Sequence, residues 1–417
     1  MSKVSSEIRS EDYKISEDRR HGGVFSGYTV MTKSMIGSGI LSIAFACSKC
    51  GLLLGIFLLF LAALLTWLSL HVLCQLSLEV SSTEVSFHSI ASHIMPKVKR
   101  FLDLALIVDC GGAAIAFIQT MGQLLAKSFE QTVGFGTLSE RVLIIIIQTV
   151  IVVMLFPMCL MKEITDTKIL NIVGLLGLVY VAILAMVYTD LSDVSATLLY
   201  PEDAMSGVSG FLIMIFAFSC QQNVLSVSTE MKNPTMRKLD AVTGSAICTG
   251  FLMYLPVMIL PFLTFGRSKS DAGTFFELLP PTVATQIGYV CAAVSVSISF
   301  VLVVHPIRRS IMTLLYGDEL PTGKKELKVR TVIVSAIVLV CLAVAIAAGS
   351  SLGPTLEFTA LLGANTCGFV MPCLLYLKHF GFQPRSFMSL AVLAMLLFCI
   401  ALYPIGITAA VLGIVNS

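Results

Sequence analysis

Long stretches of this chain contain no charged side chain, and this constrains the fold more than any other feature. Ten separate windows lack Asp, Glu, Lys and Arg altogether, and most of them contain enough apolar residues to span a bilayer. The hydrocarbon core is roughly 30 Å thick, so a helix that crosses it needs about 20 apolar residues. Only 12% of the residues are charged, whereas soluble domains have about 25%. The sequence therefore predicts an all-α integral membrane protein.

Adding the apolar segment around Lys33 gives eleven predicted spans. One of them, the third, is long enough only if it includes Asp103 and Asp109. The predicted spans cover residues of about 24–47, 51–77, 101–127, 141–161, 168–189, 207–229, 239–266, 284–307, 330–350, 354–377 and 386–413.

The basic residues are divided unequally between the two sets of loops. Of the 27 Lys and Arg, 21 lie in the N-terminal tail and the loops on its side, five lie in the opposite loops, and Lys33 lies in a span. Cytoplasmic loops carry the excess of Lys and Arg in membrane proteins. We therefore expect a cytosolic N-terminus and a C-terminus that faces outside or into an organelle. The tail, residues 1–22, lacks an apolar core and is expected to be disordered.

Lys33 is the one cation predicted at membrane depth. A charged side chain in this position costs several kcal/mol, so it is a functional-site hypothesis by default. The residue lies four positions before the triplet Gly37-Ser38-Gly39. A helix that is broken at such a triplet exposes backbone N–H and C=O groups, which can bind a ligand. The alternative is that Lys33 is a fixed structural cation.

The sixth span contains a second interruption. Its apolar run is broken by Ser219-Cys220-Gln221-Gln222-Asn223. Polar residues of this kind can simply bond neighbouring helices together, and the glycines of the first span can simply permit close helix contact. The other interpretation is that both helices are discontinuous. Interrupted segments in corresponding halves of a membrane protein point to a transporter site near the bilayer midplane.

Several segments together resemble one family. Residues Thr29–Ala46 and Phe216–Pro234 resemble the first and sixth spans of the amino acid/auxin permease family. The stretches Gly112–Gly122, His305–Ser310 and Leu361–Pro372 agree with it as well, in the same order. The resemblance covers nearly the whole chain after residue 22. The chain departs from the family pattern at Ala44, where many relatives have Pro, and at Phe117, where Tyr is common.

The resemblance implies a LeuT-type fold, in which five spans are followed by five inverted ones. A transporter domain would then occupy residues 23–417. It would contain a first repeat at about 24–189, a second at about 207–377 and an extra helix at about 386–413. The implied function is secondary active transport of amino acids by alternating access around the broken helices.

The chemistry of a zwitterion suggests which residues bind it. Helix N-termini and free N–H groups attract anions, so Gly37, Ser38 and Gly39 are expected to hold the carboxylate. Carbonyl groups of about Phe218, Ser219 and Cys220 end the first half of the sixth span and would accept the ammonium. Phe117 and Asn223 are expected to shape or cover the site, although Phe117 is equally compatible with ordinary packing.

The resemblance also bears on coupling. A sodium ion commonly lies between spans one and eight of this fold, and sodium-coupled relatives often have Asn at the position of Lys33. An ammonium there would repel Na⁺ and could replace it by exchanging a proton. Ser295 and Ser299, at i and i+4 of span eight, can share one face and are candidates to meet Lys33. Asp109 is expected to pair with Lys33, to relay protons or to line a water-filled vestibule.

Other functions are disfavoured. A nutrient sensor would be expected to have a longer soluble tail, and a membrane enzyme would need acids and histidines clustered at one depth, so we expect no enzyme. The runner-up is sodium-coupled transport of neutral amino acids. Neither a cofactor nor a metal site nor a nucleic-acid partner is expected, and the 12 cysteines lie mostly within spans. The expected partners are an amino acid, a proton or sodium ion, and the lipid of the plasma, vacuolar or lysosomal membrane.

Overall fold

The structure is a computed structural model of the whole chain. It describes the residues 22–37, 39–80, 85–133, 139–161, 168–190, 196–201, 203–270, 275, 279–317, 321, 323–349 and 352–415. The N-terminal tail predicted at residues 1–22 lies outside this set except for Gly22, and so does Ser38.

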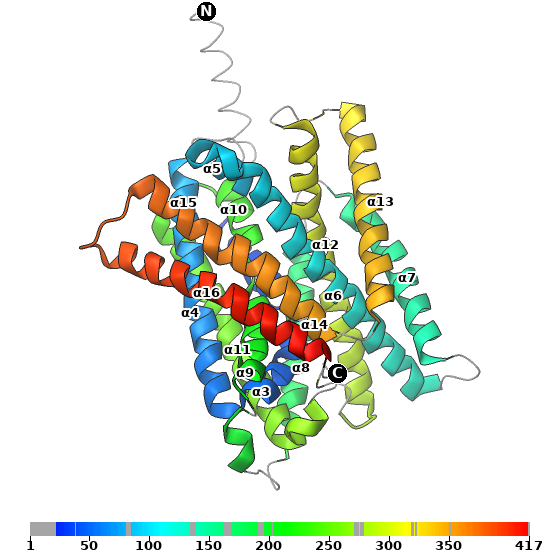
Figure 1. The fold of residues 1–417 in the computed structure, drawn as a ribbon. Helices are drawn as coiled ribbons and strands as arrows, with labels where there is room; N and C mark the ends of the chain where they lie inside the picture. Colours follow the sequence, from blue (N-terminus) through cyan, green and yellow to red (C-terminus); the bar gives the residue numbers. More distant parts are fainter. Residues whose placement is uncertain are drawn as a thin grey trace, which may run out of the picture.

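Helices account for nearly all of the described residues, as the apolar windows predict (Figure 1). The first half of the chain forms α2 (Val24–Met35), α3 (Gly39–Cys50), α4 (Leu52–Glu79), α5 (Phe87–Ile94), η1 (Pro96–Val98), α6 (Lys99–Val133), α7 (Glu140–Cys159), α8 (Lys168–Val187) and η3 (Ala196–Leu199). The second half forms α9 (Ala204–Phe218), α10 (Gln221–Glu230), α11 (Met236–Ser270), α12 (Val283–Tyr316), α13 (Gly323–Ala348), α14 (Leu352–Phe358), η5 (Thr359–Val370), α15 (Met371–Phe380) and α16 (Phe387–Val415).

The number of membrane spans agrees with the sequence. Among the described residues, ten helical segments are long and apolar enough to cross a bilayer, and the bent pair α2 and α3 makes the eleventh. These two helices meet at an angle of 49°. Because a straight helix would satisfy its own backbone groups, the bend leaves polar backbone groups to be satisfied by other partners.

Span six is also interrupted, over a shorter stretch than its run of polar residues suggests. Helix α9 ends at Phe218 and α10 begins at Gln221, so only Ser219 and Cys220 leave the helix. Span ten contains a feature that the sequence did not reveal. Between α14 and α15 the backbone widens into the π-helical segment η5, a form that is rare and frequently found at functional sites.

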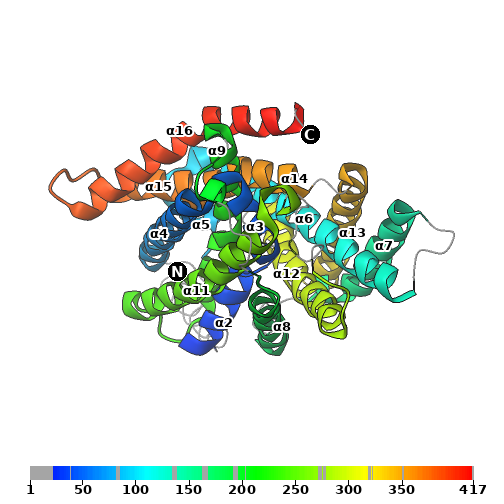
Figure 2. The ribbon, with the colours of Figure 1, turned by 90° about the horizontal axis from the view of Figure 1, so that it is seen from below.

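The broken helices lie in the middle of the molecule. Helix α3 contacts α9 and α11, and α12 packs along both α6 and α8. Viewed from below, α7 and α13 lie side by side at one edge and α16 runs along another (Figure 2). Only 22% of the apolar window of α7 is buried, against 72% for α12. The peripheral helices therefore present apolar side chains to the lipid, while the central ones pack against protein.

Helix α5, between spans two and three, was not predicted. It begins with a capping box in which Ser86 and Ser89 each accept a hydrogen bond from the other's backbone N–H. This pattern satisfies two backbone donors that the first turn would otherwise leave free. The short helix packs against α6 and lies at the same end of the bundle as α10 (Figure 1).

Candidate functional site

A small cavity lies between the two broken helices and the helices α6 and α12. Its volume is about 20 Å³, which is room for about one water molecule. We call it the central cavity. Its lining consists of Ser34, Met35, Gly37, Gly39, Asp109, Ala113, Phe117, Phe216, Ser219, Gln222 and Val303. Five of the twelve predicted site and coupling residues line it, and they include Gly37 and Gly39 from the first break and Ser219 from the second, so both helix breaks face the same space.

The two described glycines of the first break have different surroundings. A Cβ atom at Gly37 would lie 3.2 Å from the Phe117 ring and 3.3 Å from the Ser299 hydroxyl. A Cβ atom at Gly39 would lie 2.6 Å from the Cα atom of Ala217. Gly37 therefore keeps space open beside side chains of the site, whereas Gly39 lets α3 approach the backbone of α9. Ser38, predicted between them, lies outside the described residues.

The residues predicted in span six are divided between the cavity and the surrounding packing. Ser219 lines the central cavity, whereas the ring of Phe218 packs edge-on against Tyr254. Cys220 is fully buried at the N-cap position of α10. The Nδ2 atom of Asn223 donates to the Ser34 hydroxyl at 2.6 Å. This bond ties the second half of span six to the first half of span one.

Tyr254, on α11, joins the ends of both broken helices and was missed in the sequence. Its hydroxyl lies 2.9 Å from the Met35 carbonyl and 2.6 Å from the Ala217 carbonyl. Both carbonyls belong to final turns, where the helix provides no partner of its own. The Met35 carbonyl also accepts from the backbone N–H of Gly37, at 3.0 Å. A phenol in an otherwise apolar part of span seven was the available signal, but its partners come from distant segments. The single hydroxyl proton is shared between these two acceptors.

Lys33 is completely buried on α2. Its Nζ atom donates to the Ile36 carbonyl at 3.2 Å and to the Ser299 hydroxyl at 2.5 Å. These two acceptors come from spans one and eight. Helix α8 closes the remaining side, because a Cβ atom at Gly174 would lie 2.6 Å from Cε of the lysine. Within the described part of the chain, no carboxylate forms an ion pair with Lys33.

The two serines predicted on span eight have different contacts. Ser299 accepts from Lys33 and also donates weakly, at 3.4 Å, to the Ser295 carbonyl. The Ser295 hydroxyl is buried and has no hydrogen-bond partner among the described residues. Ser295 thus contributes its backbone oxygen to this chain of contacts, and its side chain remains available.

A larger cavity adjoins the central one at Gln222, which lines both. Its volume is about 250 Å³. We call it the vestibule. Its lining includes eight charged or imidazole side chains, and these are His88, Asp103, Glu230, His305, Arg308, Arg309, Glu326 and Arg330. The vestibule lies at the end of the bundle that carries α5 and α10, which is also where Gly22 pairs with Met231.

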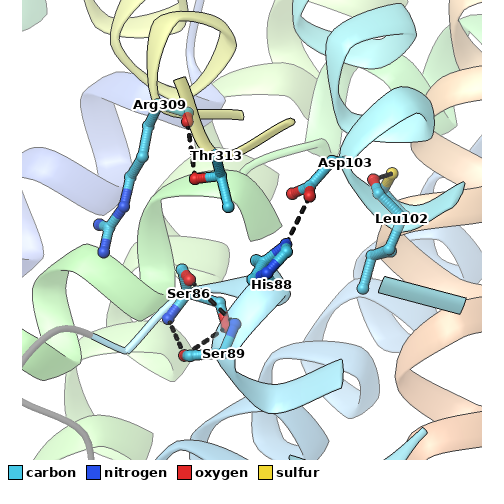
Figure 3. A network of polar contacts seen from close by, with 8 residues as sticks. Ser86, His88, Ser89, Leu102, Asp103, Arg309 and Thr313 are labelled. Atoms are coloured by element: carbon cyan, nitrogen blue, oxygen red, sulfur yellow. Dashed lines mark hydrogen bonds and ion pairs between the residues drawn. The ribbon is translucent and has the colours of Figure 1, made fainter. Parts of the chain in front are cut away.

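Figure 3 shows one wall of the vestibule. The His88 imidazole lies 2.6 Å from the Asp103 carboxylate, and both side chains are buried. The capping pair Ser86 and Ser89 holds the start of the helix that carries the histidine. On the facing helix, the hydroxyl of Thr313 donates to the Arg309 carbonyl at 2.9 Å. The His88–Asp103 pair fixes α5 against the start of α6.

Three acids within the spans are buried, and only two of them have a partner among the described residues. Asp103 bonds His88, and Glu357 accepts a hydrogen bond from Ser209. Asp109 lines the central cavity, with neither a hydrogen bond nor an ion pair to any described residue. The pairing of Asp109 with Lys33 that we considered is therefore not found among those residues, and Asp109 faces the cavity instead. No cluster of possible metal ligands occurs in the described ranges.

Comparisons with known proteins agree with this architecture. Vacuolar amino acid transporter 5 of Schizosaccharomyces pombe is 27% identical over 361 residues, which cover 85% of this chain and 84% of that protein. The putative sodium-coupled neutral amino acid transporter 11 of Danio rerio is 26% identical over 385 residues, or 87% and 81% of the two chains.

A solved structure extends the likeness to the fold. The crystal structure of MhsT in complex with L-phenylalanine has a TM-score of 0.60 and 13% identity, and the match covers 92% of this chain and 98% of that one. At this identity the likeness concerns the fold alone, and it confirms the LeuT-type architecture. The family model for transmembrane amino acid transporter proteins matches residues 20–416. The match is to transporters and not to enzymes, as the sequence led us to expect. This chain therefore belongs to the family of transmembrane amino acid transporter proteins.

Proposed function

We propose that this protein is a secondary active amino-acid transporter that moves its substrate together with protons, and that Lys33 carries the coupling. Family membership supports the transport of amino acids. The proton as the coupling ion is our inference from one observation: the Nζ atom of Lys33 is bound by oxygen atoms of spans one and eight, in a fully buried place without a carboxylate partner among the described residues.

The surroundings of Lys33 suit a neutral amine better than an ammonium. An ammonium has three N–H donors, and two acceptors are present here. A buried charge without an opposite charge is strongly unfavourable. Protonation of Lys33 would therefore favour a conformation in which water or a carboxylate reaches it. This link between protonation and conformation is what a proton-coupled transporter requires, because a ligand shifts only those equilibria whose states it binds differently.

Substrate would bind in an expanded central cavity. The N-terminal turn of α3, at Gly37 to Gly39, would hold the carboxylate through backbone N–H groups. The carbonyl groups around Phe218, Ser219 and Cys220 would accept the ammonium, with Phe117 and Asn223 at the sides. The present cavity of about 20 Å³ is too small for an amino acid, so binding requires the broken helices to separate. The vestibule of about 250 Å³ provides the adjoining space.

The membrane and the orientation also belong to this proposal. The excess of basic loops on the side of the vestibule favours a cytosolic N-terminus. The name of the fission-yeast relative supports a vacuolar membrane, with the lysosomal or the plasma membrane as the alternatives. In either case the vestibule would open toward the cytosol.

Sodium-coupled transport of neutral amino acids is the second candidate. The name of the zebrafish relative favours it. The position of Lys33 argues against it. Its nitrogen is hydrogen-bonded to oxygen atoms of spans one and eight, and a hard cation would need such oxygen atoms as ligands. An amino-acid sensor is a third possibility, and it would bind substrate without accumulating it.

The test is uptake by purified protein in proteoliposomes. A panel of labelled amino acids is offered under an imposed pH gradient, an imposed sodium gradient, or neither. We expect concentrative uptake that follows the pH gradient, collapses when a protonophore is added and ignores sodium. Uptake that follows sodium and ignores pH would replace the proton mechanism by the second candidate. Binding without any accumulation would favour the sensor.

A further inference from the structure

Asp109 has the surroundings expected of a ligand-binding residue. Its side chain is 5% exposed and lines the central cavity in a row with Ala113 and Phe117, which are spaced four residues apart along α6 and therefore share one face. The described residues offer it no hydrogen bond and no ion pair. Behind it, the backbone of η5 comes so close at Gly363 that a Cβ atom there would overlap Asp109. The residue is thus held from behind and open only toward the cavity.

A buried carboxylate without a partner is costly, and partnerless acids are rare in native structures. The other two buried acids of the spans, Asp103 and Glu357, have partners. A proton, or a cation that enters the cavity, would therefore stabilise the Asp109 carboxylate. The Gln222 Oε1 atom is likewise buried and has no partner among the described residues, and this side chain lines the same cavity. Two free acceptors from α6 and α10 thus face one space.

The position of Asp109 along α6 indicates which cation it would bind. The ring of Phe117 lies beside Gly37, where the proposed site holds the carboxylate. Asp109 is eight residues away from Phe117, which corresponds to a rise of about 12 Å. The α-ammonium is bonded to the same carbon as the carboxylate and stays near the helix breaks. A long substrate side chain that ends in a cation can cover this distance when the length of the Asp109 side chain is added to its own. A short substrate side chain cannot.

Resting on the proposed function, we propose that Asp109 binds the side-chain cation of the substrate, so that the transporter carries lysine- and arginine-like amino acids. The side chain would extend from the central cavity toward the vestibule, with Gln222 as a second acceptor at the boundary. A charged hydrogen-bonded pair formed away from water discriminates strongly against an uncharged analogue, because the carboxylate would otherwise remain buried and unpaired.

Equilibrium binding tests this recognition without depending on transport. Purified protein in detergent is titrated with arginine and with citrulline, its neutral isostere, and with lysine and with norleucine, which lacks the terminal amine. We expect wild type to favour each cation over its neutral analogue by about tenfold or more. Asp109→Asn should remove the preference while keeping the affinity for citrulline and norleucine, and Asp109→Glu should retain part of it.

Glu357→Gln is the matched control, since it removes another buried acid of the spans, which already has a partner and is not among the residues that line the two cavities; its preference should stay as in wild type. The proposal is overturned if wild type prefers the neutral analogues, or if Asp109→Asn keeps the wild-type preference and changes only the pH dependence of uptake, which would make Asp109 a proton carrier. Retained affinity for citrulline distinguishes lost recognition from a misfolded variant. Failure of the proposed function has a different signature, namely preference for cations in binding without any accumulation in proteoliposomes.

Discussion

Lys33 and Ser299 form the contact on which the coupling proposal depends. The lysine Nζ and the serine Oγ lie 2.5 Å apart, in a space that α8 closes at Gly174. Changes in size and in charge at position 33 can therefore be separated. A smaller neutral residue leaves the oxygen atoms free, and a larger cation has no room.

We predict that Lys33→Ala abolishes the response of uptake to a pH gradient and leaves exchange of internal for external amino acid. Lys33→Arg should fail as well, because a guanidinium keeps its proton in proteins. Lys33→Asn should create a weak dependence on sodium, since it removes the charge and adds an oxygen ligand. Proteoliposome uptake under each gradient is the measurement. The control is Lys49→Ala, which changes the lysine in the last turn of α3 and should leave pH coupling intact; normal pH coupling in Lys33→Ala would refute the mechanism.

The glycines of span one give a second prediction at this scale. Gly37→Ala places a methyl group 3.2 Å from Phe117 and 3.3 Å from Ser299, and these side chains can yield by a few tenths of an ångström. It should therefore raise the KM for uptake several-fold with normal amounts of folded protein. Gly39→Ala meets the backbone of Ala217 at 2.6 Å, so it should reduce the amount of folded protein itself. Size-exclusion profiles and uptake, measured on both variants, would contradict this assignment if the two behaved alike.

At the scale of helices, the ends of broken segments are held by partners from other spans. The carbonyl groups of Met35 and Ala217 share the hydroxyl of Tyr254, and Ser34 is bonded by Asn223. Such contacts compensate for the backbone bonds that a discontinuous helix loses. They also connect spans one, six and seven, which would have to move together in the alternating access that we propose.

Tyr254→Phe should destabilise the protein by about 1–3 kcal/mol, because it leaves the buried Ala217 carbonyl without its donor. It should also slow transport, since the two half-helices lose their common partner. Tyr180→Phe serves as the control. That residue donates to a single carbonyl, at Ala284, away from the breaks. Melting temperatures in detergent and uptake rates are compared, and an unchanged melting temperature in Tyr254→Phe would show that the shared bond contributes nothing.

Helix α9 begins with a cap whose effect depends on pH. The backbone N–H of Ser206 and then its hydroxyl donate to Asp203 and lower the pKa of this carboxylate. A lowered folded-state pKa gives stability that is present above the unfolded value, near 3.9, and is lost as the pH falls through the folded value. Asp203→Ala should therefore lower the stability at pH 7 and pH 5, by at most about 1 kcal/mol at this exposed site.

Melting temperatures at pH 7, 5 and 3 check this prediction. The difference in melting temperature between wild type and Asp203→Ala should become smaller only at pH 3. Asp203→Asn should keep the cap at every pH, because a neutral amide oxygen accepts the same bond. A difference that is constant from pH 7 to pH 3 would mean that the charge of the carboxylate is irrelevant to the cap.

At the scale of the whole molecule, the vestibule and the central cavity share the lining residue Gln222, and residues of both helix breaks line the central cavity. Gly22 forms a parallel bridge with Met231 beside the vestibule, so the start of the described chain lies on the vestibule side. With eleven spans, the C-terminal end must lie on the other side. In our proposal the first of these sides is the cytosolic one, because the excess of basic residues lies there.

We therefore predict that a tag placed before Met1 is digested by protease added to the cytosolic side of sealed membranes, and that a tag after Ser417 is protected. Detergent should expose both tags, which controls for cleavage sites that are resistant in themselves. Digestion of the C-terminal tag from the cytosolic side would be incompatible with eleven spans.

Much of the fold followed from the sequence by itself. The apolar windows determined the number of spans because a bilayer requires about 20 apolar residues for each crossing. Glycines in span one and polar residues in span six indicated where helices break. These are local properties, and hydrophobicity and backbone freedom act over a few neighbouring residues. The roles of the predicted site and coupling residues remain predictions.

Only the tertiary structure decided which residues share a space. Tyr254, Gly174 and Gln222 acquire their positions from segments that are remote in sequence, as does Asp109, which faces the cavity and not Lys33. The π-helical form of η5 and the close approach at Gly39 likewise depend on neighbouring helices. Packing among central helices is set by the shapes of many side chains at once, whereas the crossing of a membrane is set by composition alone. For this reason the sequence determined the class of the fold, and the three-dimensional arrangement determined the chemistry of its centre.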